Sequence, residues 1–239
     1  YATGLIGKWH CGTGKAFHPL RRGFDEFEGF SGSQDLSYFR YTLDVNEKPV
    51  KVTADYLTDD LSRRAIEFVR RHRDKRFFLH LAHYAPHRPL EAPQSIVDRY
   101  QKQGLDINTA TIYAMVEVMD RGIGELLREL KKLKLANNTV VIFASDNGPS
   151  PEGGAPIAFF DSNGIYRGGK RDFYEGGIRM PFVARWPAAI SAGTTSDHLS
   201  GFVDLLPTVS ELLNVPADHH DGISFLPTLL GENQQEQHS

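Results

Sequence analysis

Cysteine is almost absent from this chain of 239 residues, which contains only Cys11. A single cysteine excludes an internal disulfide framework and leaves the redox compartment open. Long apolar runs are also missing, because no segment approaches the roughly 18 residues that span a bilayer. Neither charge dominates, since the net charge is -3, and this balance gives no basic footprint for nucleic acid. We therefore expect neither a membrane span nor a nucleic-acid partner.

The composition favours a folded protein with a substantial core. Hydrophobic residues make up 40% of the chain and aromatic residues 11%. The length suits one large α/β domain or two small ones. No signal peptide opens the chain, and its first residue is Tyr rather than Met. We therefore expect the natural protein to begin earlier.

Apolar periodicity separates helices from strands along the chain. Residues at helical spacing predict helices over 53–72, 109–134 and 202–214. Compact apolar runs predict strands over 76–82, 139–144 and 181–186, of which the first two should be buried. Residues 1–50 are predicted to form one short strand followed by loops. This alternation of strands and helices is typical of an α/β sheet that is largely parallel.

Two of the predicted strands end in loops rich in reactive side chains. The first runs into His83 and His87, and the second runs into Asp146 and Asn147. Ligands of parallel α/β sheets bind outside the carboxyl ends of the strands. The sequence therefore predicts a functional site where these loops lie.

Asp146 and Asn147 offer a carboxylate and an amide oxygen, which are ligands for Ca²⁺ or Mg²⁺ rather than for a soft metal. A turn in which both side chains bond their own backbone explains this segment equally well. Two side chains cannot complete a calcium shell of about six or more oxygens, so further ligands must come from elsewhere.

Three other segments carry candidate side chains, each with a simpler structural explanation. Lys8 and His10 point to one side of an extended segment and could hold an anion and move a proton, or Lys8 is a surface residue beside a packed Trp. His87, between two prolines, could be an acid or base, or could bond backbone. Lys170 follows two glycines and could bind an oxyanion, or could lie in a flexible surface loop. Gly14 and Lys15 do not form a phosphate loop, because Ala16 stands where Ser or Thr is required.

The joint occurrence of these segments is more specific than any one of them. GKWH at 7–10, APHRP at 85–89, SDNG at 145–148 and RGGKRDFYEGGIRMPF at 167–182 follow in this order. Together with RRGFDEFEGF at 21–30, this set resembles the type I sulfatases of the alkaline phosphatase superfamily. The resemblance implies an alkaline-phosphatase-like, mostly parallel sheet flanked by helices. It covers residues 1–231 as a partial catalytic domain and leaves 232–239 as a polar tail.

The resemblance also implies roles for individual residues. Asp146 and Asn147 match part of the metal site, which usually holds Ca²⁺ and less often Mg²⁺. Lys8, Lys170 and His87 match residues that contact the sulfate group, and His87 also bonds the leaving oxygen. His10 matches the histidine proposed to take a proton from the hydrated formylglycine aldehyde, and Ser33 matches a serine near that nucleophile. The implied substrate is an aryl or carbohydrate sulfate ester.

One element of the family pattern is missing. Formylglycine arises in a Cys- or Ser-x-Pro-x-Arg segment, and the chain contains none. We therefore expect a fragment that is truncated at the N-terminus, lacks the small C-terminal antiparallel subdomain and is inactive alone. A phosphate or phosphonate ester hydrolase of the same superfamily and a non-catalytic domain of the same fold remain alternatives. Compartment and oligomeric state stay open, although the resemblance favours a periplasmic, secreted or lysosomal protein.

Overall fold

A computed structural model describes residues 1–32, 36–155 and 157–238. The chain divides into two compact units. Unit 1 comprises residues 1–135 and 146–180, and unit 2 comprises residues 136–145 and 181–239. Within the described residues, no helix is both long and apolar enough to cross a bilayer.

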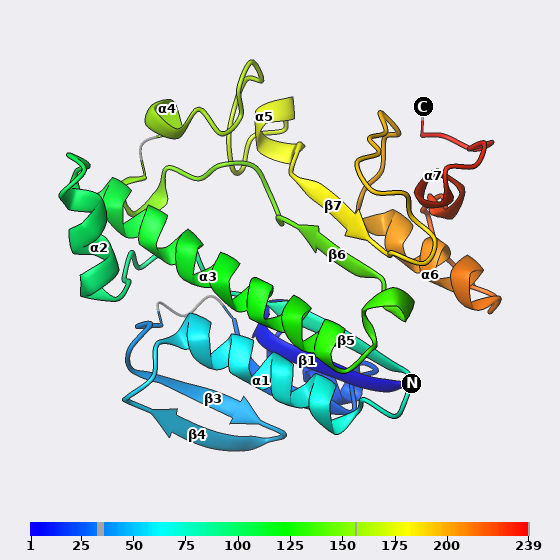
Figure 1. Cartoon of the computed structure of the whole chain (residues 1–239), viewed down its shortest axis with the longest axis horizontal. Coiled ribbons are helices and arrows are strands. Elements are labelled where there is room, and N and C mark those ends of the chain that lie inside the picture. The colour runs from blue at the N-terminus through cyan, green and yellow to red at the C-terminus, as the bar shows by residue number, and fades with distance from the viewer. Residues whose placement is uncertain (33–35, 156, 239) are drawn as a thin grey trace. The chain divides into compact units, whose positions relative to one another are not determined.

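Unit 1 is built on a five-stranded sheet with the order β4-β3-β2-β1-β5 (Figure 1). Its strands are β1 (Ala2–Trp9), β2 (Glu26–Ser31), β3 (Tyr41–Val45), β4 (Lys48–Val52) and β5 (Phe77–Ala82). Strand β1 pairs in parallel with both β2 and β5, while β3 and β4 extend the sheet as antiparallel strands. The parallel core confirms the predicted α/β class.

The middle of β1 is buried on both faces. Leu5 and Ile6 are buried, and consecutive residues of a strand point to opposite faces. The neighbouring strand comes very near at Gly7, where a Cβ would lie 1.9 Å from the carbonyl oxygen of Ala82. Gly7 also has φ +112°, a backbone conformation that residues with a side chain rarely adopt. A glycine is therefore required where β1 approaches the end of β5.

The prediction of loops after the first strand was wrong, because residues 26–52 form three further strands. The turn between β3 and β4 consists of Asn46 and Glu47, both with positive φ. This matches the mirror-image turns that suit the twist of a hairpin. Asn is a usual residue in such turns, but Glu is not, so only Asn46 pointed to a hairpin turn here.

The helices of unit 1 are α1 (Leu57–Arg71), α2 (Gln94–Gln101), α3 (Ile107–Lys132), α4 (Ile157–Phe160) and α5 (Glu175–Ile178). Helix α1 packs on β1 and β5, and α3 runs along α1 (Figure 1). The ring of Phe68 fills the space above Gly4, where a Cβ would lie 2.4 Å from the ring. Asp106 caps α3 by accepting hydrogen bonds from the backbone N–H groups of Asn108 and Thr109. Both long helices lie where their apolar stripes predicted them.

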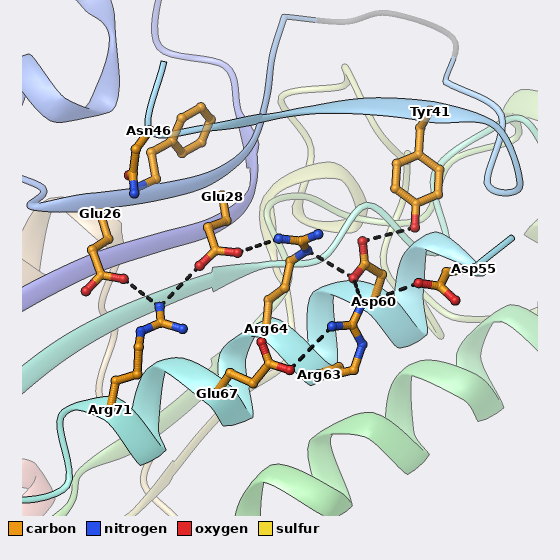
Figure 2. A network of polar contacts seen from close by, with 11 residues as sticks. Glu26, Glu28, Tyr41, Asn46, Asp55, Asp60, Arg63, Arg64, Glu67 and Arg71 are labelled. Carbon is orange, nitrogen blue, oxygen red and sulfur yellow. Dashed lines mark hydrogen bonds and ion pairs between the residues drawn. The ribbon is translucent and has the colours of Figure 1, made fainter. Parts of the chain in front are cut away.

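A network of ion pairs joins α1 to the sheet (Figure 2). The buried carboxylate of Asp60 accepts hydrogen bonds from Arg63, from Nε of Arg64 at 3.0 Å and from the hydroxyl of Tyr41 at 3.1 Å. The guanidinium of Arg64 also reaches Glu28 of β2 at 2.5 Å. A buried charge is tolerated only when it is paired in this way. The network therefore fixes the position of α1 along β2 and β3.

Strand β5 differs from its prediction in burial. The predicted strand 76–82 is present over Phe77–Ala82, but burial alternates along it, and Phe78 is 47% exposed. Among the described residues, β5 pairs with β1 and ends the sheet. An edge position exposes the side chains that a central strand would bury.

Unit 2 contains a two-stranded antiparallel sheet of β6 (Val141–Ala144) and β7 (Phe182–Arg185), and the helices α6 (Leu205–Leu213) and α7 (Leu226–Leu230). The predicted strands and the predicted helix are thus present. The expectation that 139–144 is a buried strand was wrong, since Ile142 is 36% and Phe143 42% exposed. The description of 1–231 as one domain with a tail at 232–239 stays a prediction.

Replacing Asp60 by Asn should lower the free energy of unfolding of unit 1 by about 3 kcal/mol, because two arginines would lose their buried partner. Replacing Asp59 by Asn, on the same helix, should lower it by less than about 1 kcal/mol, since its pair with Arg121 is exposed. Urea unfolding followed by Trp9 fluorescence, in a Trp186→Phe background, measures both changes. Equal effects of the two substitutions would contradict the role given to the network.

Candidate functional site

Lys8 lies near the carboxyl end of β1. Its half-buried ammonium group lies 5.6 Å from the centre of the Tyr84 ring. Burial lowers the pKa of Lys8, the charge of Asp146 opposes this shift, and the charge of Lys170 adds to it. These couplings place Asp146 and Lys170 within electrostatic reach of Lys8, although they lie far from it in sequence.

His87 lies in the loop that follows β5 and stacks on the same tyrosine. The rings of His87 and Tyr84 are 4.8 Å apart at an angle of 28°. Nδ1 of His87 lies 2.7 Å from the carbonyl oxygen of Arg88, and the hydroxyl of Tyr38 donates to the His87 carbonyl at 2.8 Å. A carbonyl can only accept, so Nδ1 carries a proton and Nε2 is the atom left for proton transfer. The loop therefore fixes both the orientation and the tautomer of His87.

The charge state of His87 depends on the cations around it. Burial lowers its pKa, and the positive charges of Lys8 and Lys170 add to the shift. The hydrogen bond to Arg88 and the charge of Glu152 act in the opposite direction. His87 is therefore biased toward the neutral form near neutral pH.

Asp146 and Asn147 begin the second segment of unit 1. Gly148, which follows them, donates its N–H to the carbonyl of Gly177 at 2.9 Å, and a Cβ at Gly148 would lie 2.0 Å from the Gly176 oxygen. Side-chain Nδ2 of Asn147 donates to the Gly148 carbonyl at 2.9 Å. A side-chain bond to the neighbouring backbone, as in the local alternative, is therefore present at Asn147. Asp146 is exposed and acts on Lys8 through its charge.

Lys170 is held by its backbone and by an acidic partner. Its N–H donates to the carbonyl of Pro149 at 2.8 Å, which joins the Lys170 loop to the segment after Asn147. Its ammonium lies 3.3 Å from Oε2 of Glu152, and both side chains are about one-fifth exposed. Lys170 is thus positioned in the loop and partly buried, unlike a flexible surface lysine.

The structure brings Lys8, His87, Asp146 and Lys170 into one electrostatic cluster within unit 1. His10 lies just beyond β1 and is exposed. Ser33 lies outside the described residues. Strand β6, which precedes Asp146, pairs with β7 in a sheet separate from that of β1 and β5. Asp146 nevertheless belongs to the same unit as Lys8.

The donor types at Asp146 and Asn147 fit a hard cation, although two residues fill only part of its shell. Within the part of the chain that the structure describes, no group of three or more His, Cys, Asp or Glu side chains could hold a metal. Any metal site here would need oxygen donors of other kinds or from elsewhere.

Sequence reasoning missed two contributors to the cluster. Tyr84 is buried and contacts both Lys8 and His87, and its place just before the APHRP motif was the available signal. Glu152 is bonded to Lys170 and influences the pKa of His87, but nothing in its local sequence indicates this. The single cysteine, Cys11, is exposed and free.

A family model described as Sulfatase matches residues 1–215 of the chain. The chain belongs to the sulfatase family. It is 32% identical to the uncharacterized sulfatase YdeN of Escherichia coli (strain K12), with 100% of this chain and 46% of that protein covered. It is also 32% identical to human N-acetylgalactosamine-6-sulfatase, with 96% and 46% covered. The chain thus spans about half the length of these relatives.

The crystal structure of Ps i-CgsB in complex with k-i-k-neocarrahexaose is similar to this sulfatase-family chain, with a TM-score of 0.87 and 34% identity. The match covers 98% of this chain and 56% of that one. The alkaline-phosphatase-like α/β fold implied by the sequence motifs is therefore confirmed.

His83, the other histidine after β5, has a different environment. Both ring nitrogens are buried and have no hydrogen-bond partner in the described structure. Burial lowers the pKa of His83 to about 4, so its ring is neutral near neutral pH. We interpret His83 as a packed residue rather than an acid or base.

The pKa of His83 predicts a loss of stability in acid. The unfolded chain binds a proton below pH 6.5, whereas the folded chain resists until about pH 4, so stability falls across this window. Between pH 7 and pH 5, the wild type should lose about 2 kcal/mol more than a His83→Phe variant. Urea unfolding at both pH values, followed by Trp9 fluorescence in the Trp186→Phe background, measures the difference. His10→Gln, at an exposed ring, should keep the wild-type dependence, and an unchanged dependence in His83→Phe would refute the assignment.

Proposed function

We propose that this chain forms the sulfate-binding part of a hydrolase that cleaves sulfate monoesters. The observation that carries the proposal is the cluster of Lys8, Lys170 and His87, in which two partly buried lysines influence one histidine. Like charges brought together in a partly buried place stabilise a negative ligand. Membership of the sulfatase family supports sulfate as that ligand.

Carbohydrate sulfates are the substrate class that we favour. One relative is named for N-acetylgalactosamine 6-sulfate, and a similar structure contains a neocarrahexaose. Both molecules are carbohydrates. Aryl sulfates remain the second possibility within the same reaction.

The proposed roles follow from where charge develops during ester cleavage. Lys8 and Lys170 bind the non-bridging oxygens of the sulfate group and stabilise their charge. His87 protonates the departing ester oxygen through Nε2, since Nδ1 is bonded to Arg88. Binding of an anion offsets the lysine charges that lower the pKa of His87. Substrate binding thus raises the affinity of His87 for the proton that it must donate.

The proposal extends to a calcium-assisted formylglycine reaction, for which this chain supplies the binding residues. His10 would take a proton from the hydrated aldehyde, and Ser33 would lie near it. The sequence contains no Cys- or Ser-x-Pro-x-Arg segment, so its residues do not fit the aldehyde group itself. We therefore expect this polypeptide to bind sulfate esters without cleaving them.

Asp146 and Asn147 are the proposed calcium ligands, through a carboxylate and an amide oxygen. A bound calcium ion would supply fixed positive charge for the sulfate oxygens. The bond from Nδ2 of Asn147 to the Gly148 carbonyl orients the amide whose oxygen would bind. Magnesium is the less favoured ion because it demands stricter octahedral geometry.

The two alternatives have less support. The matching family model is Sulfatase, which disfavours a phosphate or phosphonate ester hydrolase. A non-catalytic domain would not need its lysines and histidine to remain coupled. Binding measurements separate these possibilities.

Replacing Lys8 or Lys170 by Met should weaken the binding of galactose 6-sulfate by about tenfold or more, because each variant loses a charged hydrogen bond. Isothermal titration calorimetry on the 239-residue chain measures the change. In a cleaving form of the enzyme, the same losses should reduce turnover by about 10² to 10³. Lys48→Met, at an exposed lysine of β4, is the control. Unchanged affinity in both site variants would refute the proposed roles.

Replacing Asp146 by Ala should weaken Ca²⁺ binding by at least about tenfold, because the charged ligand is lost. Calorimetric titration with CaCl₂ and the shift in Tm on adding calcium both report the binding. Asp74→Ala removes an exposed carboxylate and should bind calcium like the wild type. If Asp146→Ala and Asp74→Ala bind calcium equally, the metal assignment fails.

A further inference from the structure

Glu152 is an acidic residue at the centre of a basic cluster. It begins the 3₁₀ helix Glu152–Gly154, and its carboxylate lies 3.3 Å from the ammonium of Lys170. Arg171 reaches its other oxygen at 2.5 Å, and Nε of Arg88 lies 3.9 Å from Oε2. Its side chain is only one-fifth exposed. Three cations therefore surround one partly buried carboxylate.

The electrostatics of Glu152 agree with this geometry. Partial burial acts to raise its pKa, but the hydrogen bond from Lys170 and the charges of Lys170, Arg171 and Arg88 outweigh burial and lower it. Glu152 is therefore ionised near neutral pH. Its charge also reaches His87, whose pKa it raises.

The contact with Lys170 bears on the anion site. Carboxylate and sulfate oxygens are the same kind of acceptor for an ammonium group. The proposed function assigns Lys170 to the sulfate group, while Glu152 already accepts a hydrogen bond from it. An anion bound at Lys170 must therefore lie close to a fixed negative charge.

The charge of the ligand decides how much this proximity matters. A sulfate monoester carries one negative charge, whereas inorganic sulfate carries two. Coulomb repulsion is proportional to the ligand charge, so Glu152 opposes the dianion with twice the free energy. The factor by which Glu152 weakens the binding of a dianion is then the square of the factor by which it weakens the binding of a monoanion.

We propose that Glu152 is a specificity-determining residue that shifts the preference of the anion site away from doubly charged anions and toward a singly charged sulfate ester. The inference rests on the proposed function, since it takes Lys170 as a sulfate ligand. The disfavoured ligands are the released inorganic sulfate and dianionic phosphate esters. Glu152 thus acts against product retention and against phosphate esters as competitors.

Glu152→Gln tests the proposal, because it removes the charge and keeps the shape. Calorimetry on the 239-residue chain at pH 8 measures the Kd values of galactose 6-sulfate and inorganic sulfate. We expect tighter binding by about threefold for the ester and about tenfold for inorganic sulfate. Glu152→Asp, which keeps the charge, should preserve the wild-type ratio of the two Kd values. Glu67→Gln removes a carboxylate from the surface of α1 and should change neither Kd.

A positioning role for Glu152 gives the opposite result. If the carboxylate only orients Lys170, Glu152→Gln weakens the binding of both ligands by a similar factor, and the proposal is overturned. An equal gain for both ligands also overturns it. The proposed function itself fails if neither the wild type nor Glu152→Gln binds either anion. It also fails if both anions bind and Lys170→Met leaves their affinities unchanged.

Discussion

The parallel pairing of β1 between β2 and β5 is the constraint on which the proposed site depends. This register places Gly7 opposite Ala82 and Lys8 opposite Phe30. The chain leaves β5 immediately after Ala82 and turns into the loop of Tyr84 and His87. A one-residue shift of β1 would turn Lys8 to the other face of the sheet. The tight approach at Gly7, where no Cβ fits, allows this register, and the ion pair between Arg64 of α1 and Glu28 joins the helix to β2.

Once the register is set, charge balance governs the cluster. Burial disfavours the charged form of Lys8, and repulsion from Lys170 adds to this effect, so the pKa of Lys8 falls. The charge of Asp146 opposes this shift at Lys8, and Glu152 accepts a hydrogen bond from Lys170. The free protein thus has the carboxylates of Asp146 and Glu152 beside the lysines that are proposed to bind sulfate. The proposed binding of sulfate would then be reversible, because part of the attraction of the lysines is already satisfied before the ligand arrives.

The sequence predicted the parts of this arrangement whose signals are local. The apolar stripes of α1 and α3 gave both helices, and the motif segments gave Lys8, His87, Asp146 and Lys170. Strand β2 was missed because its glycine and aromatic residues resemble a loop, and β3 and β4 were missed because each has only five residues. Glu152 was missed for another reason. Its partners Arg88 and Lys170 lie 64 and 18 residues away, so only the folded chain brings the three together. Burial at β5 and β6 was also mispredicted, since it depends on what lies beside each strand.

The simple structural explanations of the motif residues are compatible with their proposed functions. Asn147 does bond a neighbouring backbone group, but it uses its amide nitrogen, whereas a metal would bind the oxygen. His87 does bond the carbonyl of Arg88, and this bond selects Nε2 for proton transfer. In both residues, the local hydrogen bond fixes the position of one side-chain nitrogen and thereby orients the atom proposed to act, which is the amide oxygen of Asn147 or Nε2 of His87. Sites of this kind require side chains that are oriented before the ligand binds. The backbone contacts that make these residues look merely structural are therefore the means by which the fold would prepare them for sulfate.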